Sequence, residues 1–400
     1  MRAPRDPLFG PEHTEFREQA RAFLLEELDP ARTVGHRDPR DLTGLDGQFE
    51  REILRRAGTA GFLGISLPEE LGGGGRAPSW DAVVSYESAY HDGPLIDTAA
   101  HFLGPTLVTF GTPEQLDRIM RPAIAGTINA CIAYTEAGAG SDLTGVTTVA
   151  VPERADDDTG FALTGEKVLV TGAHKADWCC TVARTDVEST GRKGLSMFVF
   201  PMTTPGVTTK RVRTANGWDL GTLRFDDARV GPEGLLGERD QGWRTLTGAL
   251  IGERSGVVWL GWATRNVDAL LDLCARTRDR LVRDELAGVV AELFTAKCIA
   301  ARVFVAQDAG EAPFVEGSMS KVKATELLQR IARLGARVLG PEVLTAPGWF
   351  GRTTSGHGTL GEWFAYETVE RLHPALSVGA NEIQRTTIGQ VGLGLPLEPR

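Results

Sequence analysis

Long apolar runs are missing from this chain of 400 residues. The opening residues Met1 to Pro7 lead into no hydrophobic segment of the kind found in secretory signals, and no later run approaches the length of a membrane span. The five cysteines are scattered and odd in number, and the adjacent Cys179 and Cys180 lack the spacing of metal ligands. These absences predict a soluble cytoplasmic protein whose cysteines are reduced core residues.

Basic clusters interleaved with aromatic residues are also missing. The formal net charge is -10, and no group of Lys and Arg interleaved with aromatic residues overrides that balance. A nucleic-acid partner is therefore not expected. The length and the 42% of apolar residues fit an ordinary globular protein with two or three packed domains or layers.

The spacing of apolar residues divides the chain into three parts. Helical spacing begins near Phe9, Pro30 is expected to end the first helix, and helical patterns continue to residue 126, with a turn into a helix at 111–114. From Ala130, short runs rich in Val, Thr and Phe alternate with turns such as Thr164-Gly165, which predicts a small β-domain. Helical spacing returns at Gly242 and lasts almost to the end, which suits a bundle of long antiparallel helices. The apolar surface of such a bundle predicts a homo-oligomer.

The segment from Thr135 to Thr148, T-E-A-G-A-G-S-D-L-T-G-V-T-T, collects glycines and hydroxyl residues between two apolar runs. Backbone opened at Gly138 and Gly140, with hydroxyls at Thr135 and Ser141, can hydrogen-bond a flat polar heterocycle. The pattern alone fits a cofactor loop and an ordinary glycine turn about equally well. It lacks the G-x-G-x-x-G spacing of a dinucleotide-binding Rossmann unit, so a nucleotide cofactor here would need another fold.

Six blocks of sequence in the same order resemble the flavin-dependent acyl-CoA dehydrogenase family. The central one is T-E-x-G-A-G-S-D, and the resemblance covers nearly the whole chain. The other blocks are P-E-E-L-G-G at 68–73, G-T-P-E-Q at 111–115, L-T-G-E-K at 163–167, G-L-S-M-F-V-F-P at 194–201, and N-E-I-Q-R at 381–385 followed by G-L-G-L-P. The resemblance implies an α+β fold with a helical domain at 1–129, a small β-barrel or sandwich at 130–240 and a four-helix bundle at 241–400.

The resemblance also implies chemistry. It implies FAD as cofactor, an acyl thioester of coenzyme A or an acyl-carrier protein as substrate, electron-transferring flavoprotein as electron acceptor, and a homodimer or homotetramer. It needs no metal. The positions that match cofactor-binding residues of the family are Ile132, Tyr134, Thr135, Gly140, Ser141, Leu169, Thr171, Arg276, Arg278, Gly340, Asn381 and Glu382. The positions that match substrate contacts are Ser141, Arg254, Ser377 and Gly379.

Three of these positions depart from the family pattern or leave a choice open. Thr171 matches a threonine whose hydroxyl contacts flavin N5, but Leu169 stands where relatives often have an aromatic residue that shields one flavin face. Relatives often carry R-x-x-F-G where this chain has R-T-R-D-R-L-V-R. Arg276 or Arg278 could contact the FAD pyrophosphate of an adjoining subunit, and a solvated helix end explains them equally well.

The usual catalytic base is absent. Removal of hydrogens from Cα and Cβ needs a base, a hydride acceptor and donors for the enolate oxygen. The family motif I-Y-E-G-T-x-E-I-Q-R reads L-S-V-G-A-N-E-I-Q-R here, so Val378 replaces the glutamate and offers only its backbone N–H. One branch of the family carries the base in an E-R pair, which is Glu253-Arg254 in this chain.

Helical spacing supports Glu253 independently. The positions Leu246, Leu250, Val257 and Leu260 predict one helix with Glu253 on its apolar stripe. A carboxylate placed there is desolvated, and its pKa should rise toward the range of a useful base. A structural salt bridge is the other interpretation of Glu253, and Arg254 has either a substrate or a purely structural role.

Three hypotheses follow from these residues. The first is an acyl thioester dehydrogenase with Glu253 as its base. The second, motivated by Val378, is a subunit without a base that needs a related partner in a hetero-oligomer. The third is a flavin monooxygenase on the same scaffold, since relatives that activate oxygen also lack the terminal glutamate.

Overall fold

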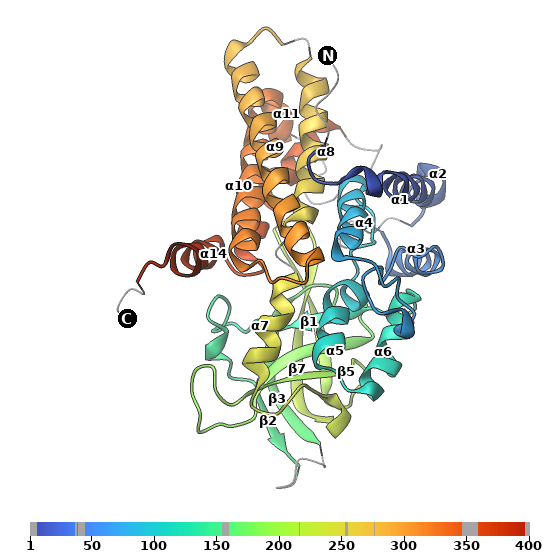
Figure 1. Ribbon diagram of the computed structural model, residues 1–400, viewed down its shortest axis with the longest axis vertical. Coiled ribbons are helices and arrows are strands. Elements are labelled where there is room, and N and C mark those ends of the chain that lie inside the picture. The colour runs from blue at the N-terminus through green and yellow to red at the C-terminus, as the bar shows by residue number, and fades with distance from the viewer. Residues whose placement is uncertain are drawn as a thin grey trace.

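The computed structural model describes residues 6–36, 38, 45–153, 160–215, 217–252, 255–275, 277–345 and 359–396. Along the chain, a group of N-terminal helices comes first, the strands of one sheet follow, and a helical bundle comes last. In Figure 1 the long bundle helices extend from the sheet, and the N-terminal helices lie along one side of both. The α+β fold class predicted from the sequence is confirmed. No helix of the described residues has the length and apolar character required to cross a bilayer.

The N-terminal part consists of short helices whose ends are marked by capping residues. Asp29 accepts a hydrogen bond from the N–H of Ala31, and Pro30 begins a second helix. The prediction that Pro30 ends the first helix is therefore wrong. Proline suits the first helical position because the N–H it lacks would have no partner there. The predicted turn at 111–114 is confirmed, since Thr112 and Gln115 form a reciprocal capping box. The elements are η1 (Pro11–His13), α1 (Thr14–Glu27), α2 (Pro30–Thr33), α3 (Gly47–Thr59), η2 (Glu69–Leu71), α4 (Pro78–His91), the π-helix η3 (Thr98–Leu103), α5 (Gly104–Phe110) and α6 (Pro113–Ile124).

The middle part is one eight-stranded sheet with the order β6-β7-β3-β2-β4-β5-β8, and β1 pairs in parallel with β4. The turn predicted at Thr164-Gly165 is wrong, because these residues lie inside β3 at an irregularity in its pairing with β7. A Cβ on Gly165 would lie 2.4 Å from Oγ1 of Thr148, so glycine permits a close approach within the sheet. The strands are β1 (Ala130–Ala133), β2 (Val149–Pro152), β3 (Phe161–Val170), β4 (Trp178–Arg184), β5 (Leu195–Pro201), β6 (Val207–Arg213), β7 (Asp219–Val230) and β8 (Leu235–Leu236), with the short helices η4 (Leu143–Gly145) and η6 (Pro232–Gly234) between them.

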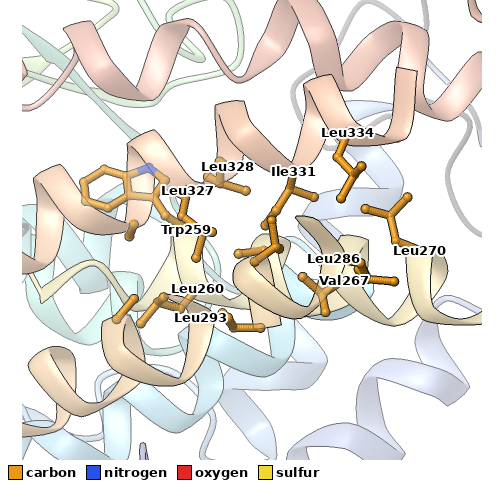
Figure 2. Packing of buried hydrophobic residues seen from close by; sticks show 14 of the residues in the cluster. Trp259, Leu260, Val267, Leu270, Leu286, Leu293, Leu327, Leu328, Ile331 and Leu334 are labelled. Carbon is orange, nitrogen blue, oxygen red and sulfur yellow. The ribbon is translucent and has the colours of Figure 1, made fainter. Parts of the chain in front are cut away.

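The C-terminal part is a helical bundle built on α8, α9, α10 and α12. Leucines and isoleucine of α10 pack between α8 and α9, as the labelled side chains in Figure 2 show. The single helix expected through Leu246 and Leu260 is instead two helices. Gly256 adopts φ +79° immediately before the second, a conformation that favours glycine. The elements are α7 (Gly242–Gly252), α8 (Val257–Cys274), α9 (Arg280–Asp308), α10 (Phe314–Leu339), α11 (Pro341–Thr345), α12 (Leu360–Glu370), α13 (His373–Leu376), α14 (Asn381–Thr387) and the π-helix η8 (Ile388–Gly392).

A buried carboxylate joins α1 to α4 and makes the fold sensitive to acid. Glu87 accepts hydrogen bonds from Arg17 at 2.5 Å and from Arg21 at 3.0 Å, and its side chain is fully buried. Burial alone would raise its pKa, but the nearby His91 imidazole, 3.6 Å away, and the hydrogen bonds from Arg21 and Arg17 outweigh burial and lower the pKa from 4.5 to about 2. The ionised carboxylate therefore stabilises the folded state above pH 4.5, and this stabilisation is lost as the pH falls toward 2.

We expect the native protein to lose about 2 kcal/mol more unfolding free energy between pH 7 and pH 3 than Glu87→Gln does, because glutamine does not titrate. Urea unfolding of both proteins across this range measures the difference. Parallel pH profiles would show that Glu87 has no depressed pKa in the folded state.

Candidate active site

The glycine loop after β1 is fixed by a buried ion pair. Glu136 and Lys167 lie 2.8 Å apart, and neither side chain is more than 5% exposed. Glu136 also accepts hydrogen bonds from the N–H groups of Thr147 at 2.7 Å and Thr148 at 3.0 Å. One carboxylate therefore closes the loop on itself and attaches it to β3, which joins two of the sequence blocks that carry the family resemblance.

The rest of this loop has open space around its glycines and hydroxyl side chains at or near the surface. Added Cβ atoms on Gly138 and Gly140 would meet nothing within 4 Å. Ser141 is exposed, and Thr135, six positions earlier in the chain, is half-buried. The carbonyl of Thr135 accepts a hydrogen bond from the N–H of Val168 at 2.9 Å, so the loop runs next to the end of β3. Ile132 and Tyr134, which precede the loop, are half-buried and lie on or next to β1.

The end of β3 presents two of the predicted cofactor contacts to solvent. Leu169 is 62% exposed and has φ +58°, and Thr171 is exposed in the following turn. Left-handed backbone is unusual for leucine and costs on the order of 1 kcal/mol or more, and such strain is concentrated at functional sites. An exposed leucine and hydroxyl beside the open glycine loop suit one face and one edge of a flat heterocycle. The residues present therefore fit the isoalloxazine of FAD.

The loop between α13 and α14 carries Val378, and its backbone is arranged unusually. Val378 has φ +54° and Gly379 has φ +77°. The side-chain amide of Gln384 donates to the carbonyls of both residues, at 3.3 Å and 3.1 Å. Among the described residues, no hydrogen-bond acceptor is found for the N–H groups of Val378, Gly379 and Ala380. Successive free N–H groups of this kind can bind an oxyanion.

Residues of helix α10 hold this loop in place by hydrogen bonds. Ser318 donates to Gln384 at 2.8 Å, which positions the amide for the two carbonyls. The buried amine of Lys321 donates to the Asn381 side chain at 2.7 Å, and Asn381 in turn donates to Thr325 at 3.1 Å. The side chain of Asn381 therefore anchors the start of α14 to the bundle. Ser377 is half-buried and Glu382 is exposed on either side of the loop.

A contact between two rings joins the loop to the sheet. Trp218 and His373 lie with ring centroids 6.2 Å apart, in an edge-to-face arrangement. Trp218 directly precedes β7, whose Gly221 pairs with Val170 at the end of β3. Burial, together with positive charges on Arg371 and Lys321, lowers the pKa of His373. His373 lies five positions before Val378. This contact therefore brings the loop between α13 and α14, called the oxyanion loop from here on, to the side of the sheet that carries Thr171.

Two predicted cofactor residues lie elsewhere. Arg278 follows α8 and Gly340 follows α10, and both turns are at the end of the bundle far from the sheet (Figure 1). Helix α10 has 26 residues, which corresponds to about 39 Å at 1.5 Å per residue. One flavin bound at the glycine loop cannot contact them on the same chain. Glu253, Arg254 and Arg276 lie outside the described residues.

Several site residues escaped sequence reasoning. Glu136, Lys167 and Gln384 all lie inside the blocks that carry the resemblance, yet their roles depend on partners 31 or more positions away or on loop carbonyls. The available signal was a charged pair of opposite sign in two matching blocks. Nothing in the periodicity of the sequence indicates that Lys167 is fully buried.

We expect Gly379→Ala to displace the oxyanion loop and to lower the rate of dehydrogenation about tenfold. Its Cβ would lie 2.6 Å from the Gln384 amide nitrogen, and alanine is disfavoured at φ +77° by about 1 kcal/mol or more. Gly310→Ala is the matched control, because it has the same φ of +77° but its Cβ would meet nothing within 4 Å. Equal rates for the two variants under steady-state assay would remove the loop from the reaction.

Comparison with known proteins assigns this fold. Models of the acyl-CoA dehydrogenase family match residues 10–127 as the N-terminal domain, 131–228 as the middle domain and 240–393 as the C-terminal domain. Acyl-CoA dehydrogenase FadE26 of Mycobacterium tuberculosis is 30% identical over 97% of this chain and 98% of its own length. Acyl-CoA dehydrogenase IpdE1 of the same organism is 32% identical over 96% of this chain and 98% of its own length.

Solved structures agree with the sequence matches. A structure described as the Tcur3481-Tcur3483 steroid ACAD superposes with a TM-score of 0.85 and 27% identity, over 98% of this chain and 99% of the other. The ChsE4-ChsE5 complex from Mycobacterium tuberculosis gives a TM-score of 0.83 and 26% identity, over 99% and 100% of the two chains.

The fold and the site define an FAD-dependent oxidoreductase that acts on acyl thioesters. The open glycine loop, the exposed end of β3 and the free N–H groups of the α13–α14 loop are what such an enzyme needs from one chain. The chain belongs to the acyl-CoA dehydrogenase family.

Proposed function

We propose that this chain is the base-bearing subunit of an acyl-CoA dehydrogenase and that Glu253 accepts the α-proton of the substrate. The observation that carries the proposal is the α13–α14 loop. Gln384 donates to the carbonyls of Val378 and Gly379, while the N–H groups of Val378, Gly379 and Ala380 have no acceptor within the described part of the chain. The loop can therefore stabilise a thioester oxygen without a side chain at position 378. FAD, when bound, supplies the acceptor for the β-hydrogen.

Contacts around α10 place Ser255, just before α8, near the residues of α10 that hold that loop. The hydroxyl of Ser320 donates to the carbonyl of Ser255 at 2.7 Å. Ser318, two positions earlier on α10, donates to the Gln384 that holds the oxyanion loop. Ser255 follows the proposed base by two positions in the sequence, and Glu253 itself lies outside the described residues. Ser255 is therefore attached to the same part of α10 as the α13–α14 loop.

The remaining predicted contacts have separate places in this proposal. Thr135, Gly140, Ser141, Leu169 and Thr171 bind the flavin on the sheet side, with Ile132 and Tyr134 behind the loop, and Asn381 and Glu382 position the end of the cofactor site. Ser141, Ser377, Gly379 and Arg254 contact the substrate. Domain boundaries near residues 129 and 240 belong to the same proposal, supported by the ranges that the family models match.

A second chain of the same fold completes the cofactor site. Arg278 and Gly340 are too far from the glycine loop to contact a flavin on their own chain, and an adjoining subunit brings such groups within reach. The partner is a second copy or a homologous chain, and both solved relatives are described as a pair of proteins. The electron acceptor proposed for the assembly is an electron-transferring flavoprotein, and cytoplasmic location remains part of the proposal.

Val378 motivates one alternative, in which this chain lacks a functional base and a homologous partner supplies it. Anaerobic reduction of bound flavin by a panel of acyl-CoA esters tests the choice. The panel should include straight, branched and steroid-side-chain esters, since one solved relative is described as a steroid ACAD.

Bleaching of the oxidised flavin band by the chain alone would support the proposal. Bleaching only after addition of a homologous partner, with Glu253 of this chain dispensable, would establish the alternative. Reduction that requires a nicotinamide donor, followed by oxygen-dependent hydroxylation, would instead identify a monooxygenase.

A further inference from the structure

One buried lysine of α10 holds both ends of the oxyanion loop. Lys321 is fully buried, and its ammonium donates to the carbonyl of Ala375 at 3.2 Å and to the side-chain oxygen of Asn381 at 2.7 Å. Ala375 precedes residues 376–380, and Asn381 follows them. A single ammonium therefore fixes the separation between the two ends of the segment whose N–H groups can bind an oxyanion.

The side chain of Asn381 has a fixed orientation toward this ammonium. Its amide nitrogen donates to Thr325 at 3.1 Å and to Glu326 at 3.3 Å. The hydroxyl of Thr325 donates in turn to the backbone carbonyl of Lys321 at 2.9 Å. Because acceptors on α10 hold the amide nitrogen, the amide oxygen is left to accept from the lysine. These hydrogen bonds join the start of α14 to one turn of α10.

The positive charge of Lys321 is buried close to the oxyanion loop. Its ammonium lies 6.0 Å from the ring centre of Trp259 on α8, which Figure 2 labels. The carbonyl and the amide oxygen that accept from it are neutral groups, so these two hydrogen bonds do not cancel its charge. Electrostatic interactions between buried groups are stronger than in water because the local dielectric is low. A negative charge that develops on an oxygen at the loop would therefore interact favourably with the ammonium.

Two other charged side chains near the loop have partners of opposite sign. Arg371 donates two hydrogen bonds of 2.6 Å to the carboxylate of Glu367. Glu326 lies 2.5 Å from the guanidinium of Arg385. Their charges are largely offset by these partners. A change at Lys321 therefore alters the electrostatic potential at the loop without breaking either pair.

The imidazole of His373 shows that the field of the lysine extends to α13. Burial, and then the positive charges of Arg371 and Lys321, lower the pKa of His373. The direction is the same although a carboxylate oxygen of Glu370 lies 3.9 Å from the ring. The potential around the start of the oxyanion loop is therefore positive, as stabilisation of an anionic oxygen requires.

We propose that Lys321 is a positioning residue for the enolate that forms when the substrate loses its α-proton. The inference rests on the proposed function. In that step the α C–H bond breaks, the proton goes to the base, and the electron pair moves onto the thioester oxygen. Lys321 holds both ends of the oxyanion loop in place, and its positive charge stabilises the negative oxygen more than the neutral thioester.

Ionisation of acetoacetyl-CoA bound to the FAD-loaded protein tests this role without turnover. This β-ketothioester has a neutral form and an enolate form, and the enolate is measured by its near-ultraviolet absorbance. We expect the ratio of bound enolate to bound neutral form to fall about tenfold in Lys321→Gln, because glutamine can donate to Asn381 but carries no charge. Lys321→Arg keeps the charge and should restore most of the enolate.

Two controls separate this role from a purely structural one. Lys323→Gln should leave the enolate ratio at the native value, since Lys323 is on the same helix but pairs with Glu292 of α9 at 2.7 Å. A CoA thioether that lacks the thioester oxygen should bind equally well to native protein and Lys321→Gln. Equal enolate ratios in native protein and Lys321→Gln would overturn the proposal. A loss of thioether binding as large as the loss of enolate would overturn it too, because the lysine would then only support the fold.

Asn381→Asp is a second variant that tests the proposal even where Lys321→Gln does not fold. Its carboxylate keeps the contact with Lys321 as an ion pair and cancels the positive charge. The enolate ratio should therefore fall about tenfold in this variant as well. An unchanged ratio in Asn381→Asp would exclude an effect of the lysine charge on the bound oxygen.

Turnover distinguishes this inference from the proposed function. In Lys321→Gln the kcat for an acyl-CoA should fall about tenfold with little change in KM, because the negative charge develops only during the reaction. An enolate ratio that depends on Lys321, in a protein that dehydrogenates no thioester, would refute the proposed function and keep the role of the lysine. Native protein that binds neither acetoacetyl-CoA nor the thioether would refute both.

Discussion

Glu253→Gln is expected to lower the rate of flavin reduction by acyl-CoA about 100-fold to 10,000-fold, the range typical for loss of a positioned general base. Glutamine preserves the shape of the side chain but does not accept a proton at neutral pH. Val378 leaves no carboxylate at the usual position near the C-terminus, so this chain has no spare base there. Stopped-flow measurement of the flavin band under anaerobic conditions gives the rate directly.

The same variant should retain FAD and substrate affinity, because the glycine loop, β3 and the oxyanion loop are unchanged. Glu311→Gln makes the same chemical change at an exposed position in the α9–α10 turn and should behave like the native protein. Loss of reduction with full binding identifies a base. Native-like reduction by Glu253→Gln would exclude Glu253 and return the role to a partner chain.

Periodicity predicted the long helices because their apolar stripes are local features of the sequence. Leu293 and Ala300 of α9, and Leu328 and Ile331 of α10, are all buried, as their spacing requires. Periodicity did not predict the helix boundary that backbone geometry sets. An apolar stripe continues across Gly256, yet the positive φ of that glycine separates α7 from α8.

The break has a consequence for the proposed base. The burial of Glu253 was inferred from a stripe on one continuous helix, and this premise is wrong. The case for Glu253 now rests on the attachment of Ser255 to α10 and on the family resemblance. Glu253 as the base stays a prediction, because Glu253 lies outside the described residues and no continuous helix carries it on an apolar stripe.

The candidate site shows a similar division. Matching blocks located the glycine loop, the end of β3 and the α13–α14 loop, because each block is short and continuous. The distances between blocks depend on strand register and helix length, which local spacing does not encode. For this reason the sequence grouped Gly340 with the other cofactor residues, although the length of α10 puts it at the far end of the bundle, where Arg278 also lies, the residue expected to serve an adjoining subunit.

The Glu136–Lys167 pair is the contact whose loss should most destabilise the sheet. Lys167→Met leaves the Glu136 carboxylate buried without its cation, which typically costs about 3–5 kcal/mol. Burial alone would raise the pKa of Glu136, but hydrogen bonds to Lys167, Thr147 and Thr148 outweigh burial and hold the pKa at about 2. Without the lysine this pKa should rise, and the glycine loop should release FAD at neutral pH. Urea unfolding and the fraction of retained flavin measure the two effects.

A double variant separates charge from packing. Glu136→Gln with Lys167→Met removes both charges, so it should recover most of the stability lost by Lys167→Met alone, since neutral replacement of a buried pair is often tolerated. An exposed pair in the same sheet, Arg229 and Glu153 at 3.0 Å, provides the contrast, and Arg229→Met should cost less than about 1 kcal/mol.

Because the glutamine can still accept from Thr147 and Thr148, flavin retention should return together with stability. A double variant that regains stability but not FAD would show that the ionised Glu136 itself shapes the loop for the cofactor. A double variant no more stable than Lys167→Met would show that the buried charge is not what destabilises the single variant.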